Sequence, residues 1–180
     1  MRLPFNIRRN TFYFLASLAS LLSSPTVIAA ERVVVRYNIF RESISVDELT
    51  TFVETGKSSP TINYYLNQAR QDPQTFRNVL TQEVNVSPVV LDRTLNNPIG
   101  EFLLDRIGKT IHTPSGQTNR QALRAAIVLS ASKGNKVSLL KILQNYPTSE
   151  VYVEGDRLVE TYNQISLLVD NLPNFLVNSL

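Results

Sequence analysis

The spacing of apolar residues predicts short strands at both ends of the region that follows residue 30. Three consecutive β-branched valines stand in the segment Arg32–Tyr37, which is typical of a strand. The segment Ser43–Ser45 has the composition of a second short strand, and Val151–Val153 emerges from a polar turn as a third. We expect Val151–Val153 to pair with Val33–Val35, which would bring the two ends of the domain together.

Between residues 45 and 108 the apolar positions recur at helical spacing, and the helix starts are marked. Ser45 and Glu48 fit a capping box, in which the serine caps an amide and the glutamate reaches back. At each later start a proline follows the capping residue, where its missing N–H costs nothing. These starts are Ser59–Pro60, Asp72–Pro73, Ser87–Pro88 and Asn97–Pro98. Glycines at positions 56 and 108 are the expected stops.

The second half of the chain predicts further helices. A polar turn at residues 113–118 precedes a helix that Thr118 or Asn119 caps, and residues 137–143 predict another. Asp156 is expected to cap the last helix. The apolar stripe of that helix is Leu158, Tyr162, Ile165, Val169 and Leu172.

The helical spacing also assigns apolar residues to inward faces. Among the residues assigned inward are Phe52, Leu66, Val79, Leu80, Val89, Ile99, Phe102 and Leu129. These patterns predict a mainly α protein with several short amphipathic helices and a minor two- or three-stranded β element. We expect residues 31–180 to form a single domain.

Residues 1–30 follow a different pattern. Three arginines precede the apolar run Phe12–Leu22, and small residues follow up to Ala30, which is typical of a secretory signal peptide. The run is shorter than the ~20 apolar residues that a membrane-spanning helix needs. We expect cleavage near Ala30 and a periplasmic or extracellular protein; retention of the segment as an N-terminal anchor is the alternative.

Removing residues 1–30 changes the charge balance. The chain has 18 Lys and Arg and 15 Asp and Glu, and three of the basic residues but no acidic ones lie in this segment. The remainder carries no net charge, so nucleic acid is not an expected partner. The chain has no cysteine, which excludes thiol chemistry and cysteine-based zinc sites.

The residues that could carry chemistry are few. The sequence contains no Gly-x-Ser-x-Gly, and its one histidine is His112. We considered His112 as a general base with Ser115 as nucleophile, against a histidine at a helix-to-loop boundary that makes one hydrogen bond. We also considered Glu101 with Asp105 as an acid/base or cation-binding pair, against a solvated helix face.

The turn Glu154–Gly155–Asp156 could bind calcium, but a turn with a helix cap explains it. From these comparisons we predict no catalytic residue, no cofactor-binding residue, no metal ligand and no cofactor. The segment from Ile165 to Leu180 is notably apolar, which indicates either a buried C-terminal helix or a surface for a partner protein or lipid.

Several segments resemble a cyanobacterial domain of unknown function that usually precedes a secreted alpha/beta hydrolase domain. The resemblance covers nearly all of the region after residue 30. It is carried by Arg32–Tyr37, Ser43–Val46, Thr55–Gly56, Asn97–Glu101, Leu123–Ala126 and Leu139–Pro147. In that family the catalytic serine lies in the hydrolase domain, which we find nowhere up to Leu180. The resemblance therefore implies an accessory module and carries over no catalytic residue.

Three hypotheses on function follow. The first is a secreted non-catalytic interaction domain whose partner is a hydrolase or an envelope protein. The second is a lipid-binding module in which short helices enclose an apolar pocket. The third is a small-ester hydrolase with a non-standard site, which would depend on His112. The oligomeric state stays open.

Overall fold

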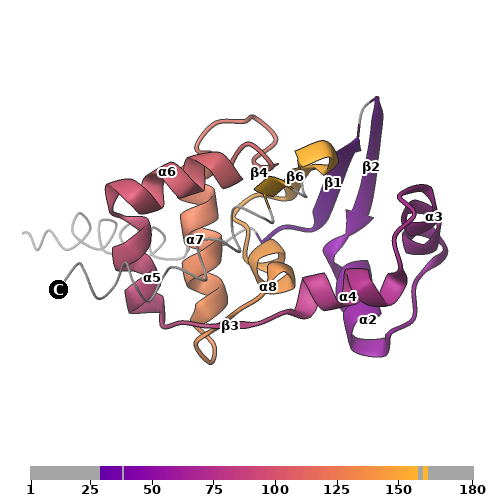
Figure 1. The fold of residues 1–180 in the computed structure, drawn as a ribbon, viewed down its shortest axis with the longest axis horizontal. Helices are drawn as coiled ribbons and strands as arrows, with labels where there is room; N and C mark the ends of the chain where they lie inside the picture. Colours follow the sequence, from indigo (N-terminus) through magenta and orange to yellow (C-terminus); the bar gives the residue numbers. More distant parts are fainter. Residues whose placement is uncertain (1–28, 38, 158–159, 162–180) are drawn as a thin grey trace, which may run out of the picture.

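The computed structural model describes residues 29–37, 39–157 and 160–161, and it is mainly α with a small sheet (Figure 1). The strands are β1 (Arg32–Tyr37), β2 (Phe40–Ser45), β3 (Val84–Asn85), β4 (Ile111–His112), β5 (Lys136–Val137) and β6 (Glu150–Glu154). The helices are α2 (Val46–Thr55), α3 (Pro60–Gln68), α4 (Pro73–Thr81), α5 (Pro88–Leu95), α6 (Pro98–Ile107), α7 (Asn119–Ala131) and α8 (Leu139–Gln144), followed by the 3-10 turn η2 (Gly155–Arg157). The predicted fold class is confirmed.

The main sheet has the strand order β2-β1-β6-β4. Val33 lies opposite Val151 in the parallel β1–β6 pair, so the predicted pairing of the two chain ends is confirmed. β1 and β2 form an antiparallel hairpin, and β4 adds an antiparallel edge to β6. Because β4 has only two residues, alternation in the sequence could not reveal it, and the main sheet has one strand more than we expected.

The capped helix starts are also confirmed. The side chains of Ser59, Asp72, Ser87 and Asn97 each accept a hydrogen bond from the amide three residues ahead, at 2.8–3.2 Å. A proline occupies the first position of each of these helices. Ser45 caps α2 through the Glu48 amide at 3.0 Å, and Gly56 ends this helix in the left-handed conformation. The Glu48 carboxylate, which the capping box predicted to reach back to Ser45, accepts a hydrogen bond from the Ser59 hydroxyl and so connects the starts of α2 and α3.

Two boundaries differ from the sequence-based expectation. Residues 137–143 do not form one helix, because Val137 pairs with Val84 in a small sheet and Ser138 caps α8 through the Lys141 amide. α7 begins at Asn119, but the preceding Thr118 makes no capping hydrogen bond with its side chain and has a φ of 54°. The Asn119 side chain accepts instead from Thr113, which ties the preceding loop to the helix.

One face of the main sheet and the helices share the hydrophobic core. Val33, Val151 and Val153 of the sheet belong to the same buried cluster as Phe52 and Leu123. Some residues that the helical spacing assigned inward are exposed instead: Val79, Val89, Ile99, Phe102 and Leu129. The expectation was wrong at these positions because short helices packed at angles bury a narrower stripe than the apolar spacing covers.

The chain is described up to Thr161, whose hydroxyl is buried against the Thr110 hydroxyl at 2.6 Å. Most of the predicted signal peptide, and the stripe predicted for the last helix at Leu158, Tyr162, Ile165, Val169 and Leu172, lie outside the described residues. Within the described part, none of the helices has the length and apolar character that crossing a membrane requires.

Candidate functional site

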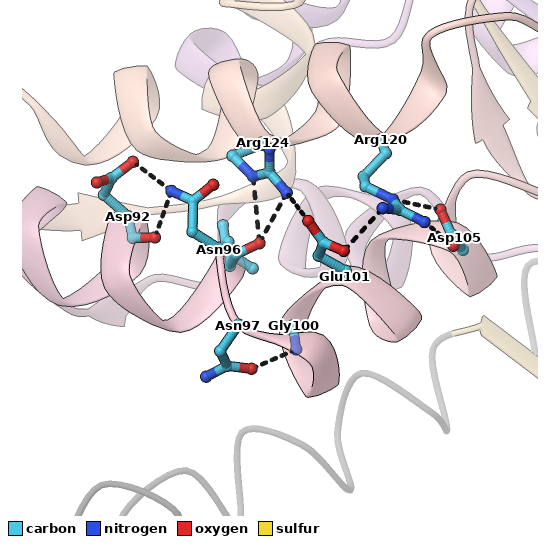
Figure 2. Close-up of polar contacts among 9 residues, drawn as sticks. Asp92, Asn96, Asn97, Gly100, Glu101, Asp105, Arg120 and Arg124 are labelled. Carbon is cyan, nitrogen blue, oxygen red and sulfur yellow. Dashed lines mark hydrogen bonds and ion pairs between the residues drawn. The ribbon is translucent and has the colours of Figure 1, made fainter. Parts of the chain in front are cut away.

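Two of the segments that carried the family resemblance meet in space, where α5, α6 and α7 join (Figure 2). Asn97–Glu101 forms the start of α6, and Leu123–Ala126 lies in the middle of α7. Arg124 donates from Nε and Nη2 to the Leu95 carbonyl at 3.1 and 3.0 Å. The guanidinium of Arg124 therefore satisfies a carbonyl at the end of α5, which would otherwise lack an intrahelical partner.

Arg120 is the second arginine of this junction (Figure 2). Its Nε lies 2.8 Å from Asp105 Oδ1 and its Nη2 lies 2.5 Å from Asp105 Oδ2, so this contact is bidentate. Its Nη1 lies 2.8 Å from Glu101 Oε2, and Arg124 reaches the other Glu101 oxygen at 3.4 Å. The hydrogen bonds from Arg120 hold the pKa of the Asp105 carboxyl below its usual range, and the same contact raises the pKa of Arg120.

The two carboxylates of α6 are therefore brought together as their spacing predicted, but they face α7 and its arginines. Glu101 and Asp105 are not a free acid/base pair; the solvated face that we considered fits better, since their side chains are 40% and 48% exposed, but both also pair with Arg120. A carboxylate that already accepts from arginine is a poor proton acceptor and a poor cation ligand. The sequence pattern did not indicate the two arginines as partners, because Arg120 lies 15 residues after Asp105 and Arg124 lies 23 residues after Glu101.

Gly100 allows α5 and α6 to pack this closely. A Cβ atom added at this position would lie 2.0 Å from the Thr94 carbonyl oxygen and 2.7 Å from the Leu95 Cα. Both obstacles are backbone atoms, which cannot move aside as a side chain can. In the segment Asn97–Glu101, the asparagine caps the helix, the proline starts it, the glycine permits the contact and the glutamate holds the arginines.

Ile99 is the remaining residue of that segment, and it points away from the junction with 51% of its surface exposed. Phe102 lies three residues further along the same helix face and is 57% exposed. The Arg106 guanidinium covers the Phe102 ring from 5.1 Å. α6 thus has an inner face packed on α5 and α7 and an apolar outer face with a cation at its end.

A cleft of about 350 Å³ opens beside the junction, between the end of α6 and the start of α7. It is lined by polar and charged side chains that include Asp105, Lys109, Thr118 and Arg120. A lipid chain needs an apolar enclosure, so this cleft does not fit the lipid-binding pocket that we considered.

His112 lies in β4, on the sheet face opposite the core, and not at a helix-to-loop boundary as we expected. Its Nε2 lies 2.9 Å from Glu154 Oε1 and its Nδ1 lies 2.7 Å from the Thr113 carbonyl oxygen. Glu154 also pairs with Arg36 at 3.1 Å, so the imidazole belongs to a contact across three strands. Both ring nitrogens face oxygen acceptors, which leaves neither directed at a serine.

Ser115, the proposed nucleophile, makes its contacts within its own loop. Its hydroxyl lies 3.2 Å from the Thr113 hydroxyl and accepts from the Gln117 amide at 3.2 Å. Glu154, the first residue of the considered calcium turn, is engaged by His112 and Arg36. Among the described residues, no group of three or more His, Asp or Glu side chains is placed to hold a metal ion.

Comparison with known proteins gave one family. Residues 29–154 match the model of the family described as "Alpha/beta hydrolase of unknown function (DUF1400)". No curated protein and no solved structure gave a significant match. The matched range contains the main sheet, the junction of α5, α6 and α7, and both segments of Figure 2. Because the match covers well over half of the sequence, the chain belongs to this family of alpha/beta hydrolases of unknown function.

Proposed function

We propose that this chain is an exported, non-catalytic accessory module that works with an alpha/beta hydrolase. The proposal rests on one observation: the side chains that could act in catalysis already make hydrogen bonds or ion pairs within the domain. His112 lies between Glu154 and the Thr113 carbonyl, and Ser115 is bonded within its loop. Glu101 and Asp105 are bound by arginines. These side chains hold the domain together.

Family membership supports the link to hydrolases. A serine hydrolase of the alpha/beta type attacks through a serine on a sharp turn, and the sequence lacks the Gly-x-Ser-x-Gly that forms it. The family match and the lack of this motif between residues 1 and 180 support a role beside a catalytic domain that supplies the serine.

The start of the described domain supports export. The Glu31 amide donates to the Ser149 carbonyl at 2.8 Å, and the Glu31 carbonyl accepts from the Val46 amide at 2.9 Å. Among the described residues these backbone contacts begin at Glu31, one residue after the predicted cleavage point, although the Ala30 side chain is itself buried in the core cluster. Cleavage there leaves the Glu31 nitrogen able to donate as an ammonium group.

The test uses the full chain expressed with its own N-terminus in a Gram-negative host. We expect the periplasmic fraction to contain a product whose N-terminal sequence starts at or close to Glu31. The purified product should neither turn over p-nitrophenyl butyrate nor react with a fluorophosphonate probe, and His112→Ala should leave both results unchanged. Ester turnover that disappears in His112→Ala would establish the enzyme hypothesis instead. A product that stays cytoplasmic would remove the export part of the proposal.

A further inference from the structure

The main sheet has a second face, opposite the hydrophobic core, and the centre of this face is buried. Side chains alternate between the two faces along a strand. Val33 and Val151 belong to the core cluster, so the neighbouring residues Val34 and Tyr152 lie on the second face. Val34 is 2% exposed and Tyr152 is 9% exposed, although neither belongs to the cluster that the sheet forms with the helices. Their burial therefore needs cover on the side of the sheet away from those helices.

Polar side chains form a border around the centre of the second face. The Arg41 guanidinium lies 4.9 Å from the centroid of the Tyr152 ring and donates to the Tyr152 hydroxyl. The His112 ring lies on the other side of Tyr152, with 5.6 Å between the ring centroids. Arg36 and Glu154 pair at 3.1 Å near the end of the sheet. An apolar centre with a polar border is the composition of a sheet face that packs against a helix.

The chain reaches the second face at Thr161. The Glu154 amide donates to the Thr110 carbonyl at 2.8 Å, which continues the ladder between β4 and β6 through Thr110. Because the next residue, Ile111, belongs to the core cluster, alternation directs the Thr110 side chain to the second face. The Thr110 hydroxyl lies 2.6 Å from the Thr161 hydroxyl, and both residues are buried. Glu160 and Thr161 are helical, so a helix begins on the second face at the end of β6.

The sequence that follows has an apolar side in register with this contact. On a helix, the residues four, seven and eleven positions after Thr161 lie on the same side as Thr161. These residues are Ile165, Leu168 and Leu172. The opposite side contains the polar residues Asn163, Ser166 and Asp170. The side that Thr161 directs at the sheet is therefore the apolar one.

We propose that residues 162–172 continue the helix that includes Thr161 and pack their apolar side on the second face of the main sheet, over Val34 and Tyr152. A helix from Thr161 to Leu172 is about 16 Å long, and the six residues of β1 span a similar length of about 16 Å. Pro173 follows, where a helix commonly ends. The sheet then has a helical layer on each face. The apolar side of this segment is part of the domain and is not a surface for a partner protein or a lipid.

The experiment places a nitroxide spin label on the second face of the full chain. The chain has no cysteine, so Ser43→Cys gives a single attachment site. Ser43 is exposed and lies opposite Val34 in the β1–β2 ladder, which puts the label on the second face. We expect this label to broaden the amide NMR signals of Ile165, Leu168 and Leu172.

Lys133→Cys is the matched control label. Lys133 is exposed and follows α7, whose start is bonded to Thr113 beside β4 and whose length is about 20 Å. A label at Lys133 should therefore leave the signals of residues 162–172 unchanged. A second control mixes the spin-labelled Ser43→Cys chain with an isotope-labelled wild-type chain. The mixture should show no broadening, because the contact is made within one chain.

A pair of substitutions tests which side of the segment faces the sheet. Leu168→Asp puts a charge on the apolar side and should lower the melting temperature by about 5 °C or more. It should also abolish the broadening by the Ser43 label. Ser166→Asp adds the same charge on the opposite side and should leave both measurements unchanged.

Three results would overturn the proposal. Signals of residues 162–172 that neither label broadens would show that the segment does not lie on the second face. Broadening by the Lys133 label in place of the Ser43 label would put the segment on the helical side of the domain. Broadening in the mixed sample would assign the second face to the segment of a second copy. Equal effects of Leu168→Asp and Ser166→Asp would contradict the helix side that Thr161 defines.

Discussion

The two faces of α6 differ in how much of each contacts the rest of the domain and how much is exposed to solvent. On the inner face the glycine, the carboxylates and the helix cap each have a partner in α5 or α7 or in the helix itself. On the outer face Ile99 and Phe102 are mostly exposed, and the Arg106 guanidinium lies over the Phe102 ring. The same ten residues thus show which side chains the domain needs to fold and which are available for function.

Gly100→Ala should have the largest effect of any substitution on α6. The added methyl group would lie 2.0 Å from the Thr94 carbonyl oxygen, so α5 and α6 would have to separate. We expect a loss of at least about 3 kcal/mol in the free energy of unfolding, or no folded protein at all. Urea unfolding followed by circular dichroism measures it. The neighbouring Ile99→Ala, on the exposed face, should cost no more than about 0.5 kcal/mol. Similar losses for both variants would contradict the contrast between the faces.

Replacing an arginine should distinguish the faces by charge. Arg124→Met removes the donors to the Leu95 carbonyl and to Glu101, and should cost about 2 kcal/mol because charge-assisted hydrogen bonds are lost. Arg106→Met removes an outward guanidinium and should cost less than about 0.5 kcal/mol. The difference between the two midpoints of urea unfolding is the measurement. A cost for Arg106→Met that matches Arg124→Met would show that the outer arginine is structural.

Acid should weaken the ion pair between Asp105 and Arg120 on the inner face of α6. Because Arg120 lowers the pKa of Asp105 in the folded state, the unfolded chain takes up this proton at a higher pH than the folded chain does. The contribution of Asp105 is therefore complete above its usual pKa of about 4 and is lost as the pH falls through the lowered value. Unfolding midpoints between pH 6 and pH 2 should fall less steeply in Asp105→Asn. An identical pH profile for both proteins would show that the pair contributes nothing.

The smallest effect is expected deep in the core, at Tyr146. Its ring is fully buried and its hydroxyl has no hydrogen-bond partner among the described residues, and burial raises the pKa of this group. Tyr146→Phe removes an unsatisfied polar atom and keeps the ring, so stability should stay unchanged or rise by up to about 1 kcal/mol. Differential scanning calorimetry measures the shift in melting temperature. A clear loss of stability would reveal a partner for the hydroxyl and would make this position part of a polar network.

Local signals in the sequence determined most of the helical structure. Ser59, Asp72, Ser87 and Asn97 each act within three residues of their own position, and the proline after each fixes the backbone of the first turn. Such signals need no tertiary context, which explains why the starts were predicted correctly. The pairing of Val33 with Val151 was predictable for another reason, because only a few strand-forming segments were available as partners.

The tertiary structure alone decided which polar side chains form hydrogen bonds and ion pairs with one another. Nothing near Glu101 in the sequence indicates Arg120, and nothing near His112 indicates Glu154, since these pairs are separated by 19 and 42 residues. Burial followed the same rule: the helical spacing singled out Phe102 and passed over Leu104, yet packing buried Leu104 completely and left Phe102 exposed. An amphipathic pattern specifies that a helix has an apolar face, whereas the angle at which neighbouring helices cross decides how much of that face is covered.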